Sequence, residues 1–357
     1  SVRPKANTAS PEAIAGRYNL LDILKIGGKI PHEEVLRKQL ESDVLLLISW
    51  DNEKEKMFIP GKIYEYFALK KRGTSFKNMD EINDFEKLKK LVEDMQKNAD
   101  KLGIKGVFAA TSLKTGEDWR WQTHLANIPI YYEYKDKNVN DLDAIDFKYG
   151  KNMRDLFDLY LDYSCTPRSA VKTKTVSDSM EEFALGKCAM IQNGNWGWGQ
   201  IAGVEGNVVA AEDVKFLPIY TGVAGEENQG LCTGTENFWC VNAFAAEEDI
   251  AATLAFMNWC VTSEKGTTAM ANDMGFVIPF KAAAESPNLF VKQDVAYTAE
   301  GKNPVSWNFP TMPSEEWKNG VGTALTMYAA DQTDDNWAAV VTAFVDGWAS
   351  EYALANG

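Results

Sequence analysis

Hydrophobic and polar positions along this chain form two kinds of pattern: a continuous apolar run, and apolar residues at helical spacing. Residues 43–49 form an almost continuous apolar run, which suits a strand buried on both faces of a parallel sheet. Met79–Lys101 instead has apolar residues at helical spacing among lysines and glutamates, and Glu247–Thr262 is a second strong helical pattern. Because helices and short strands alternate, the pattern predicts an α/β protein with central sheets.

The remaining expected elements rest on local start and stop signals such as Pro, Gly and capping acids. Asp118 can cap a helix that carries residues 119–124. The other expected helices cover residues 31–42, 61–69, 153–163, 177–185 and much of the chain from 315 to its end, and the other expected strands cover 19–26, 106–113, 188–192, 215–219 and 237–243, with an extended link at 275–279.

Length and charge narrow the function classes. The 357 residues suffice for two domains, and no apolar run approaches the length of a membrane span. A formal net charge of -14 argues against binding to nucleic acid, because an acidic surface repels phosphates. Residues 1–72 carry 13 Lys/Arg and 10 Asp/Glu, so the remaining residues carry 24 and 41, a net of -17. Only Trp50 of the 11 tryptophans lies before residue 73, so the composition changes there.

The segment 192–199 is the strongest candidate for a binding site. It reads Gln-Asn-Gly-Asn-Trp-Gly-Trp-Gly, so Trp196 and Trp198 stand two apart among glycines, next to the amide of Asn193. Sugars offer apolar C–H faces and a rim of hydroxyls, which flat aromatic rings and amide side chains can bind. The alternative is that both tryptophans only pack in the interior. The polar setting favours the binding interpretation.

A similar combination occurs at 117–124, where Trp119 and Arg120 lie at an expected helix start. The alternative here is a capped helix with a buried tryptophan pair. Glu236, within 236–239, and the segment 306–309 repeat the pairing of aromatic and polar groups more weakly, and packing is the better interpretation of both.

Motifs for catalysis and metal binding are missing from the sequence. There is no Gly-x-Ser-x-Gly, no phosphate-binding Gly-x-x-x-x-Gly-Lys-Ser/Thr and no His-Glu-x-x-His, and the two histidines exclude a multi-histidine metal site. Adjacent acids such as Glu117 and Asp118 do not by themselves make a glycosidase. Five cysteines without metal spacing leave open a bridge between Cys232 and Cys240 in an oxidising compartment. We therefore expect neither catalytic residues nor a cofactor.

Residues 73–357 resemble the family 1 extracellular solute-binding proteins, the maltose-binding-protein-like receptors of carbohydrate ABC importers. The resemblance rests on an ordered series of segments: 73–80, 118–127, 183–190, 193–198, 216–218, 238–243, 247–261, 262–266 and 275–279. Each segment alone is weakly specific, whereas their shared order is strongly specific.

This resemblance implies a periplasmic-binding-protein-like fold of two α/β lobes, with a sugar held in the cleft between them. Residues 73–215 and 276–357 would form mainly the second lobe, and 216–275 mainly the first. The ligand-binding residues would be Trp196, Trp198, Asn193, Trp119, Arg120 and Glu236. The resemblance also implies a monomer outside the cytoplasm that binds a carbohydrate and ABC permease subunits, with a membrane anchor if a lipoprotein signal preceded Ser1; Ser1–Gly16 contain no secretory signal.

The front of the chain departs from that family, so the first lobe is expected to be incomplete or replaced. Segments 27–36, 42–50 and 59–68 resemble the C-terminal nucleotide-sugar-binding half of two-Rossmann-domain glycosyltransferases, in which Glu65 would contact the donor ribose. One hypothesis is a chimera joined near 66–72, in which neither activity is intact. The alternatives are a divergent solute-binding protein, a retained transferase or an adhesion protein.

Overall fold

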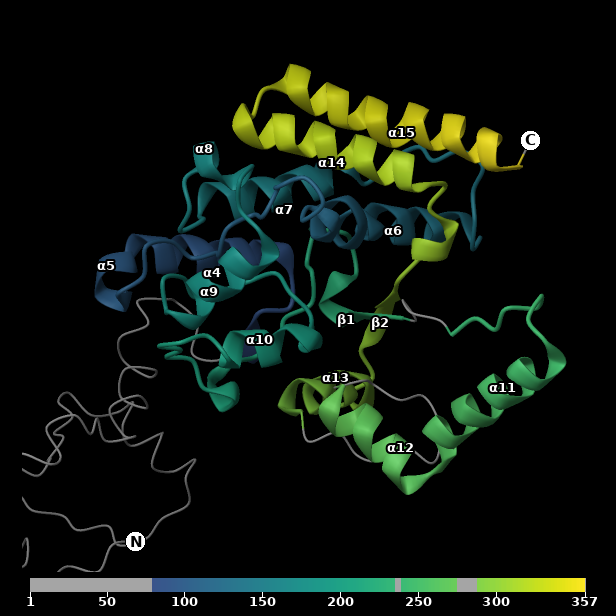
Figure 1. Cartoon of the computed structure of the whole chain (residues 1–357). Coiled ribbons are helices and arrows are strands. Elements are labelled where there is room, and N and C mark those ends of the chain that lie inside the picture. The colour runs from purple at the N-terminus through teal and green to yellow at the C-terminus, as the bar shows by residue number, and fades with distance from the viewer. Residues whose placement is uncertain (1–78, 235–238, 275–287, 357) are drawn as a thin grey trace, which may run out of the picture. The chain divides into compact units, whose positions relative to one another are not determined.

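The computed structural model describes residues 79–234, 239–274 and 288–356, which all belong to the second of two units, Gly73–Gly357 (Figure 1). The elements expected before Met79, the link at 275–279, and Glu65 and Glu236 lie outside the described residues. Predictions about them stay predictions.

The described part of the chain is rich in helix. In chain order, η marking 3-10 and π-helices, its elements are η1 (Met79–Glu81), α4 (Phe85–Lys97), α5 (Ala99–Leu102), η2 (Arg120–Leu125), α6 (Asn127–Lys137), α7 (Gly150–Asp162), α8 (Arg168–Val171), α9 (Val176–Ala184), η3 (Asn195–Gly197), α10 (Trp198–Ala202), η4 (Ala211–Asp213), η5 (Glu226–Asn228), β1 (Gln229–Thr233), α11 (Glu247–Thr262), α12 (Glu264–Thr268), η6 (Ala269–Asp273), α13 (Leu289–Ala299), β2 (Asn303–Ser306), η7 (Phe309–Thr311), α14 (Glu315–Ala330) and α15 (Asp334–Asn356).

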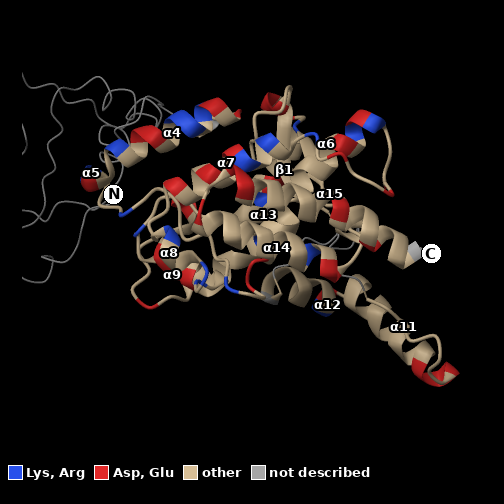
Figure 2. Ribbon diagram, turned by 90° about the horizontal axis from the view of Figure 1, so that it is seen from above, with Lys and Arg blue, Asp and Glu red and all other residues tan. Residues whose placement is uncertain are grey.

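Helix boundaries follow the capping signals of the sequence. Asp84 accepts a hydrogen bond from the backbone of Lys87 at the start of α4, whose apolar positions face the core while its exposed side mixes lysines and acids (Figure 2). Thr175 and Asp178 form a reciprocal capping box at the start of α9. The expected helix 79–101 is divided into η1, α4 and α5, with breaks at residues 82–84 and at Asn98.

The central sheets expected from the sequence are largely absent from the described residues. Their only sheet is the parallel pair of β1 and β2. The expected strands 106–113 and 188–192 are reduced to isolated bridges, through which Phe108 pairs with Ser164 and with Met190. No strand forms at 215–219 or at 239–243. The α/β expectation is therefore met only loosely.

A physical reason for the missing strand at 215–219 lies in α13. The side-chain amide of Gln293 donates to the carbonyl of Val214 at 2.8 Å and accepts from the amide of Phe216 at 2.8 Å. The hydroxyl of Tyr297 donates to the carbonyl of Phe216 at 2.8 Å. Because these side chains satisfy the backbone groups that a neighbouring strand would pair, the segment stays irregular.

The largest core packs α14 and α15 against α4, α6 and α7. Figure 1 shows α14 and α15 side by side. Trp317 and Trp348 are at most 2% exposed, and their rings meet edge to face at 5.0 Å. Each indole N–H reaches a backbone carbonyl, that of Phe344 at 3.0 Å and that of Leu142 at 2.9 Å. Both rings are therefore buried without losing a hydrogen bond, which favours the folded state.

Gly322 on α14 allows close contact with the residues that precede η2. A methyl group at this position would lie 2.3 Å from Asp118 Oδ2, and Asp118 is itself buried. We expect Gly322→Ala to lower the free energy of unfolding by about 1–3 kcal/mol through overpacking. Gly320→Ala, two residues away in the same helix with nothing within 4 Å, should instead stabilise by up to about 1 kcal/mol. Urea midpoints of the two variants test this, and equal shifts would contradict it.

The side chain of Glu182 in α9 bonds three residues that are separated in sequence. It is 5% exposed and accepts from the amide of Ala110 at 2.9 Å, from the hydroxyl of Thr166 at 2.6 Å and from the ammonium of Lys174 at 3.0 Å. Burial raises the pKa of this carboxyl, but the hydrogen bonds to Thr166, Ala110 and Lys174 outweigh burial and leave the pKa lowered.

A lowered folded-state pKa gives Glu182 a defined effect on stability. Its contribution is complete above the ordinary pKa of 4.5 and is lost as pH falls through the lower folded-state value. We expect Glu182→Gln to destabilise the protein by about 1–3 kcal/mol at pH 7 and by less at pH 3. Urea titrations at both pH values measure this, and a loss of equal size at the two would contradict the linkage.

Candidate functional site

Five rings form a continuous chain of contacts, which we call the aromatic row: Trp196, Trp119, His124, Trp307 and Phe309. Ring centroids of Trp196 and Trp119 are 5.7 Å apart, and those of Trp119 and His124 are 5.2 Å apart. His124 lies 4.8 Å from Trp307 and 4.9 Å from Phe309. Trp307 and Phe309 stack on each other at 5.0 Å. The row thus joins segments that are far apart in sequence.

The π-helix η2 explains why Trp119 and His124 meet. In a π-turn, residues five apart lie one above the other, whereas an α-helix would bring residue i+4 to that place. The hydroxyl of Thr123 donates to the carbonyl of Trp119, so the 2.9 Å contact with His124 Nδ1 is one in which the imidazole donates. These bonds fix the orientation of the imidazole ring within the row.

The other end of the row is held by the strand pair. Trp307 directly follows β2, and its amide donates to the carbonyl of Thr233 in β1 at 2.9 Å. A methyl group on Gly234 would lie 3.0 Å from the β-carbon of Trp307. Glu236, a predicted ligand residue outside the described residues, is two positions further along the chain. The role of Glu236 in binding stays a prediction. Gly234, the last described residue before it, lies beside Trp307.

Trp196 is the most exposed ring of the row, with 43% of its surface accessible. It lies in the single turn η3, and its indole folds back over Gly194, where an added methyl group would be only 2.5 Å from Nε1. Gly197 similarly lies against the side chain of Asn193, at 2.9 Å from Nδ2 to an added methyl. The glycines around Trp196 are therefore required for its position, and they leave one part of the ring open to a solute.

Trp198 has a different environment from Trp196. Its ring is half-buried and meets Phe290 of α13 edge to face at 5.2 Å. It also packs against the core cluster formed by α9 and its neighbours. The structure therefore separates the two predicted platforms, placing Trp196 in the aromatic row and Trp198 in a packing contact.

Arg120 lies beneath the row rather than on its surface. It is 1% exposed, and its guanidinium donates to the carbonyl of Gln192 at 2.7 Å and to the hydroxyls of Ser112 and Ser179. Burial lowers its pKa to about 10, against a raising effect of Glu117. The bond to Gln192 ties the segment that leads into Trp196 to the start of η2. This geometry suits a residue that positions the site.

Two side-chain atoms near Trp196 have no hydrogen-bond partner among the described residues: Gln192 Oε1 and Asn193 Nδ2. Asn193 uses its other atom, Oδ1, to accept from the amide of Gly194 at 2.9 Å. Buried polar atoms without partners are costly unless something else binds them. They are an acceptor and a donor of the kind that binds hydroxyl groups, and a solute on the exposed indole reaches them only if these buried side chains rotate outward.

Sequence reasoning did not assign His124, Trp307 or Phe309 to the site. The segment 306–309 has a visible signal, an aromatic and amide pairing, but such a pairing in sequence favours packing. His124 carried no periodic signal because the π-turn that aligns it with Trp119 breaks helical spacing. Only tertiary contacts reveal the row.

Other kinds of site find no support in the described residues. They contain no group of three or more His, Cys, Asp or Glu that could hold a metal ion. Their cysteines are free thiols, including half-buried Cys232 and exposed Cys240, so the suggested bridge between these two is not formed in this structure. No helix among them combines the length and the apolarity needed to cross a bilayer.

Comparison with known proteins gives one match. The family model described as bacterial extracellular solute-binding protein matches residues 59–299, about two thirds of the 357 residues. No curated protein and no solved structure matches. The matched region begins inside the front segment that resembles glycosyltransferases, and no comparison supports a glycosyltransferase origin for it.

Proposed function

Because this chain belongs to the bacterial extracellular solute-binding proteins, we propose that it captures a carbohydrate for an ABC importer. Proteins of this family lie outside the cytoplasm, bind a solute and present it to the permease subunits of a transporter, and they catalyse no reaction. The finer statement, that the solute is a carbohydrate, rests on the chemistry of the aromatic row. In this proposal the receptor acts as a monomer.

The observation that carries the proposal is the half-exposed indole of Trp196 beside unpartnered amide atoms. Its exposed fraction is 43%, while Trp119 supports it at 5.7 Å. A pyranose ring can lie on such an indole with its C–H face, and its hydroxyls can bond Gln192 Oε1 and Asn193 Nδ2 once these buried side chains rotate outward. Nearby, Trp307 connects this surface to the strand that precedes Glu236.

The predicted lobes and the role of Glu236 remain part of the proposal. Residues 73–215 and 276–357 are proposed to form mainly one lobe and 216–275 mainly the other, with the solute between them. A complete cleft needs groups from both lobes. We therefore expect weak or no binding if the first lobe is incomplete, because fewer groups then surround the sugar.

Isothermal titration calorimetry of the full chain tests the solute class. The protein should be titrated with a panel of mono- and oligosaccharides and, in parallel, with amino acids and short peptides. The proposal expects saturable heat with at least one saccharide and a change in tryptophan fluorescence at the same concentrations. Saturable binding of a peptide or amino acid with none of any saccharide would overturn the carbohydrate assignment while leaving the family membership intact.

A further inference from the structure

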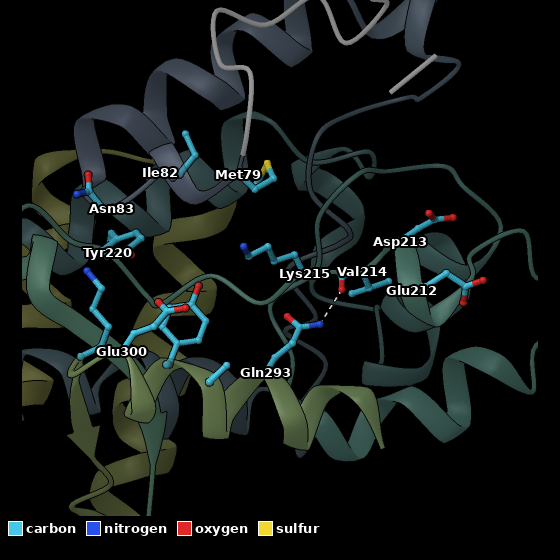
Figure 3. A pocket seen from close by; sticks show the side chains of 13 residues that line it. Met79, Ile82, Asn83, Glu212, Asp213, Val214, Lys215, Tyr220, Gln293 and Glu300 are labelled. Carbon is cyan, nitrogen blue, oxygen red and sulfur yellow. Dashed lines mark hydrogen bonds between the residues drawn. The ribbon is translucent and has the colours of Figure 1, made fainter. Parts of the chain in front are cut away.

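A cavity lies apart from the aromatic row. It has a volume of about 590 Å³ and is bordered by η1 and the link between η1 and α4, by residues 212–215, by Tyr220 and by one face of α13 with the turn after it (Figure 3). No residue of the aromatic row lines it. Its volume is within the range of about 300–1,000 Å³ that holds small molecules in proteins.

The wall of this cavity is fixed before any ligand arrives. Gln293 of α13 bonds the backbone of Val214 and of Phe216, each at 2.8 Å, and Figure 3 shows the first of these bonds. Tyr297 adds a third bond to the same segment, and the ammonium of Lys302 donates to the carbonyl of Glu227 at 2.8 Å. Because these hydrogen bonds already order the side chains of the wall, ligand binding does not have to order them.

Tyr220 is the best-placed group for recognition. Its side chain is 2% exposed, it borders the cavity, and its hydroxyl has no hydrogen-bond partner among the described residues. Burial raises the pKa of this phenol above its usual range, and Tyr297, Glu226 and Asp84 add to the effect. The hydroxyl therefore stays protonated at neutral pH. The hydroxyl is not one of the fully buried atoms without a partner, so it keeps accessible surface and can donate to or accept from a ligand.

The charged groups at the cavity favour a cation. Glu212, Asp213 and Glu300 line it and make no hydrogen bond or ion pair with their carboxylates among the described residues, whereas Lys215 and Lys302 supply two positive charges. Three acids against two lysines leave a negative excess, and residues 73–357 as a whole carry 24 basic and 41 acidic residues. A negative cavity concentrates cationic solutes.

From this arrangement we propose that the cavity is a second binding site, for a small organic amine. A diamine would place one ammonium near Tyr220 and Glu300 and the other near Glu212 and Asp213, which Figure 3 shows on opposite sides of Lys215. The hydrocarbon part would lie against Ile82, Val214 and the tyrosine rings. This site is independent of the carbohydrate proposed for the aromatic row.

Calorimetry of the full chain with putrescine tests the proposal, with uncharged 1,4-butanediol as the matched control ligand. Putrescine should bind saturably, more weakly as ionic strength rises, and butanediol should not bind. Tyr220→Phe should weaken putrescine binding about 5- to 10-fold, since it removes one hydrogen bond. The triple variant Glu212→Gln, Asp213→Asn, Glu300→Gln, altered only at exposed positions, should abolish it.

Trp196→Ala should leave putrescine binding unchanged, which separates this site from the aromatic row. Absence of saturable putrescine binding, equal binding of butanediol, or full binding by the triple variant would each overturn the proposal. These outcomes concern putrescine alone, so they leave the carbohydrate assignment untouched. Circular dichroism of each variant confirms that lost binding is not lost folding.

Discussion

Trp196→Ala is expected to weaken carbohydrate binding about 30-fold while lowering the stability less than the loss of a more deeply packed tryptophan would. The ring is 43% exposed, so its removal withdraws only part of a tryptophan surface from the folded protein. Bound solute, however, would lose the flat surface on which a sugar ring lies, and a central tryptophan in a binding site contributes about 2 kcal/mol or more. Calorimetric titration with the saccharide that binds wild-type protein measures the change.

Trp198→Ala provides the matched control for that experiment. Trp198 is half-buried against Phe290 and the α9 core cluster, so its loss should lower the unfolding midpoint more than the loss of Trp196 does. Its effect on saccharide affinity should be the smaller of the two. The reverse pattern, with affinity lost only in Trp198→Ala, would move the binding surface to the other indole and contradict the aromatic-row assignment.

Helices were the most predictable feature of this fold. Glu247–Thr262 was expected from its pattern and forms α11 with the same bounds, and 177–185 differs from α9 by one residue at each end. These segments carry their own hydrogen bonds and caps, so local sequence suffices to define them. Figure 2 shows α11 almost without charge beyond its first turn, where Glu247, Glu248 and Asp249 lie.

Strands were the least predictable feature, because a strand exists only where a partner lies beside it. The apolar run 215–219 looks like a strand in sequence, but Gln293 and Tyr297 occupy its backbone groups. Nothing local to that run reveals side chains some 80 positions away. The pair of β1 and β2 was missed for the same reason, since its register depends on contacts between residues such as Cys232 and Val305.

The site was predictable in part. Residues marked by a local sequence pattern were found, and residues that join the site only through tertiary contacts were not. Trp196 and Trp119 stood out because tryptophans in polar, glycine-rich segments are unusual, and the structure brings their rings together. Arg120 stood out for the same reason, but the sequence could not show that its side chain points inward. Residues that enter the row through a π-turn or a strand end carried no comparable local pattern.

Arg120→Met is expected to have the largest effect on stability of the changes considered, lowering the free energy of unfolding by about 3 kcal/mol. Arginine pays a desolvation cost when buried, and the lowered pKa of about 10 reflects it. Its three hydrogen bonds to Gln192, Ser112 and Ser179 offset that cost. Methionine fills similar space but leaves those oxygens without a donor, and unsatisfied buried acceptors cost about 1–3 kcal/mol each.

Saccharide affinity should fall in the same variant. Without the hydrogen bond from Arg120 to the Gln192 carbonyl, the segment that carries Trp196 is no longer held in place. Arg154→Met is the control: Arg154 also contacts aromatic rings and donates to the hydroxyl of Tyr328, but it is 25% exposed and its ion-pair partner Asp334 is 90% exposed, so its loss should change stability by about 1–2 kcal/mol. Urea unfolding and calorimetry of both variants separate two roles for Arg120. Wild-type stability combined with lost affinity would mean that the guanidinium contacts the solute directly, whereas a parallel fall in both identifies it as the residue that positions Trp196.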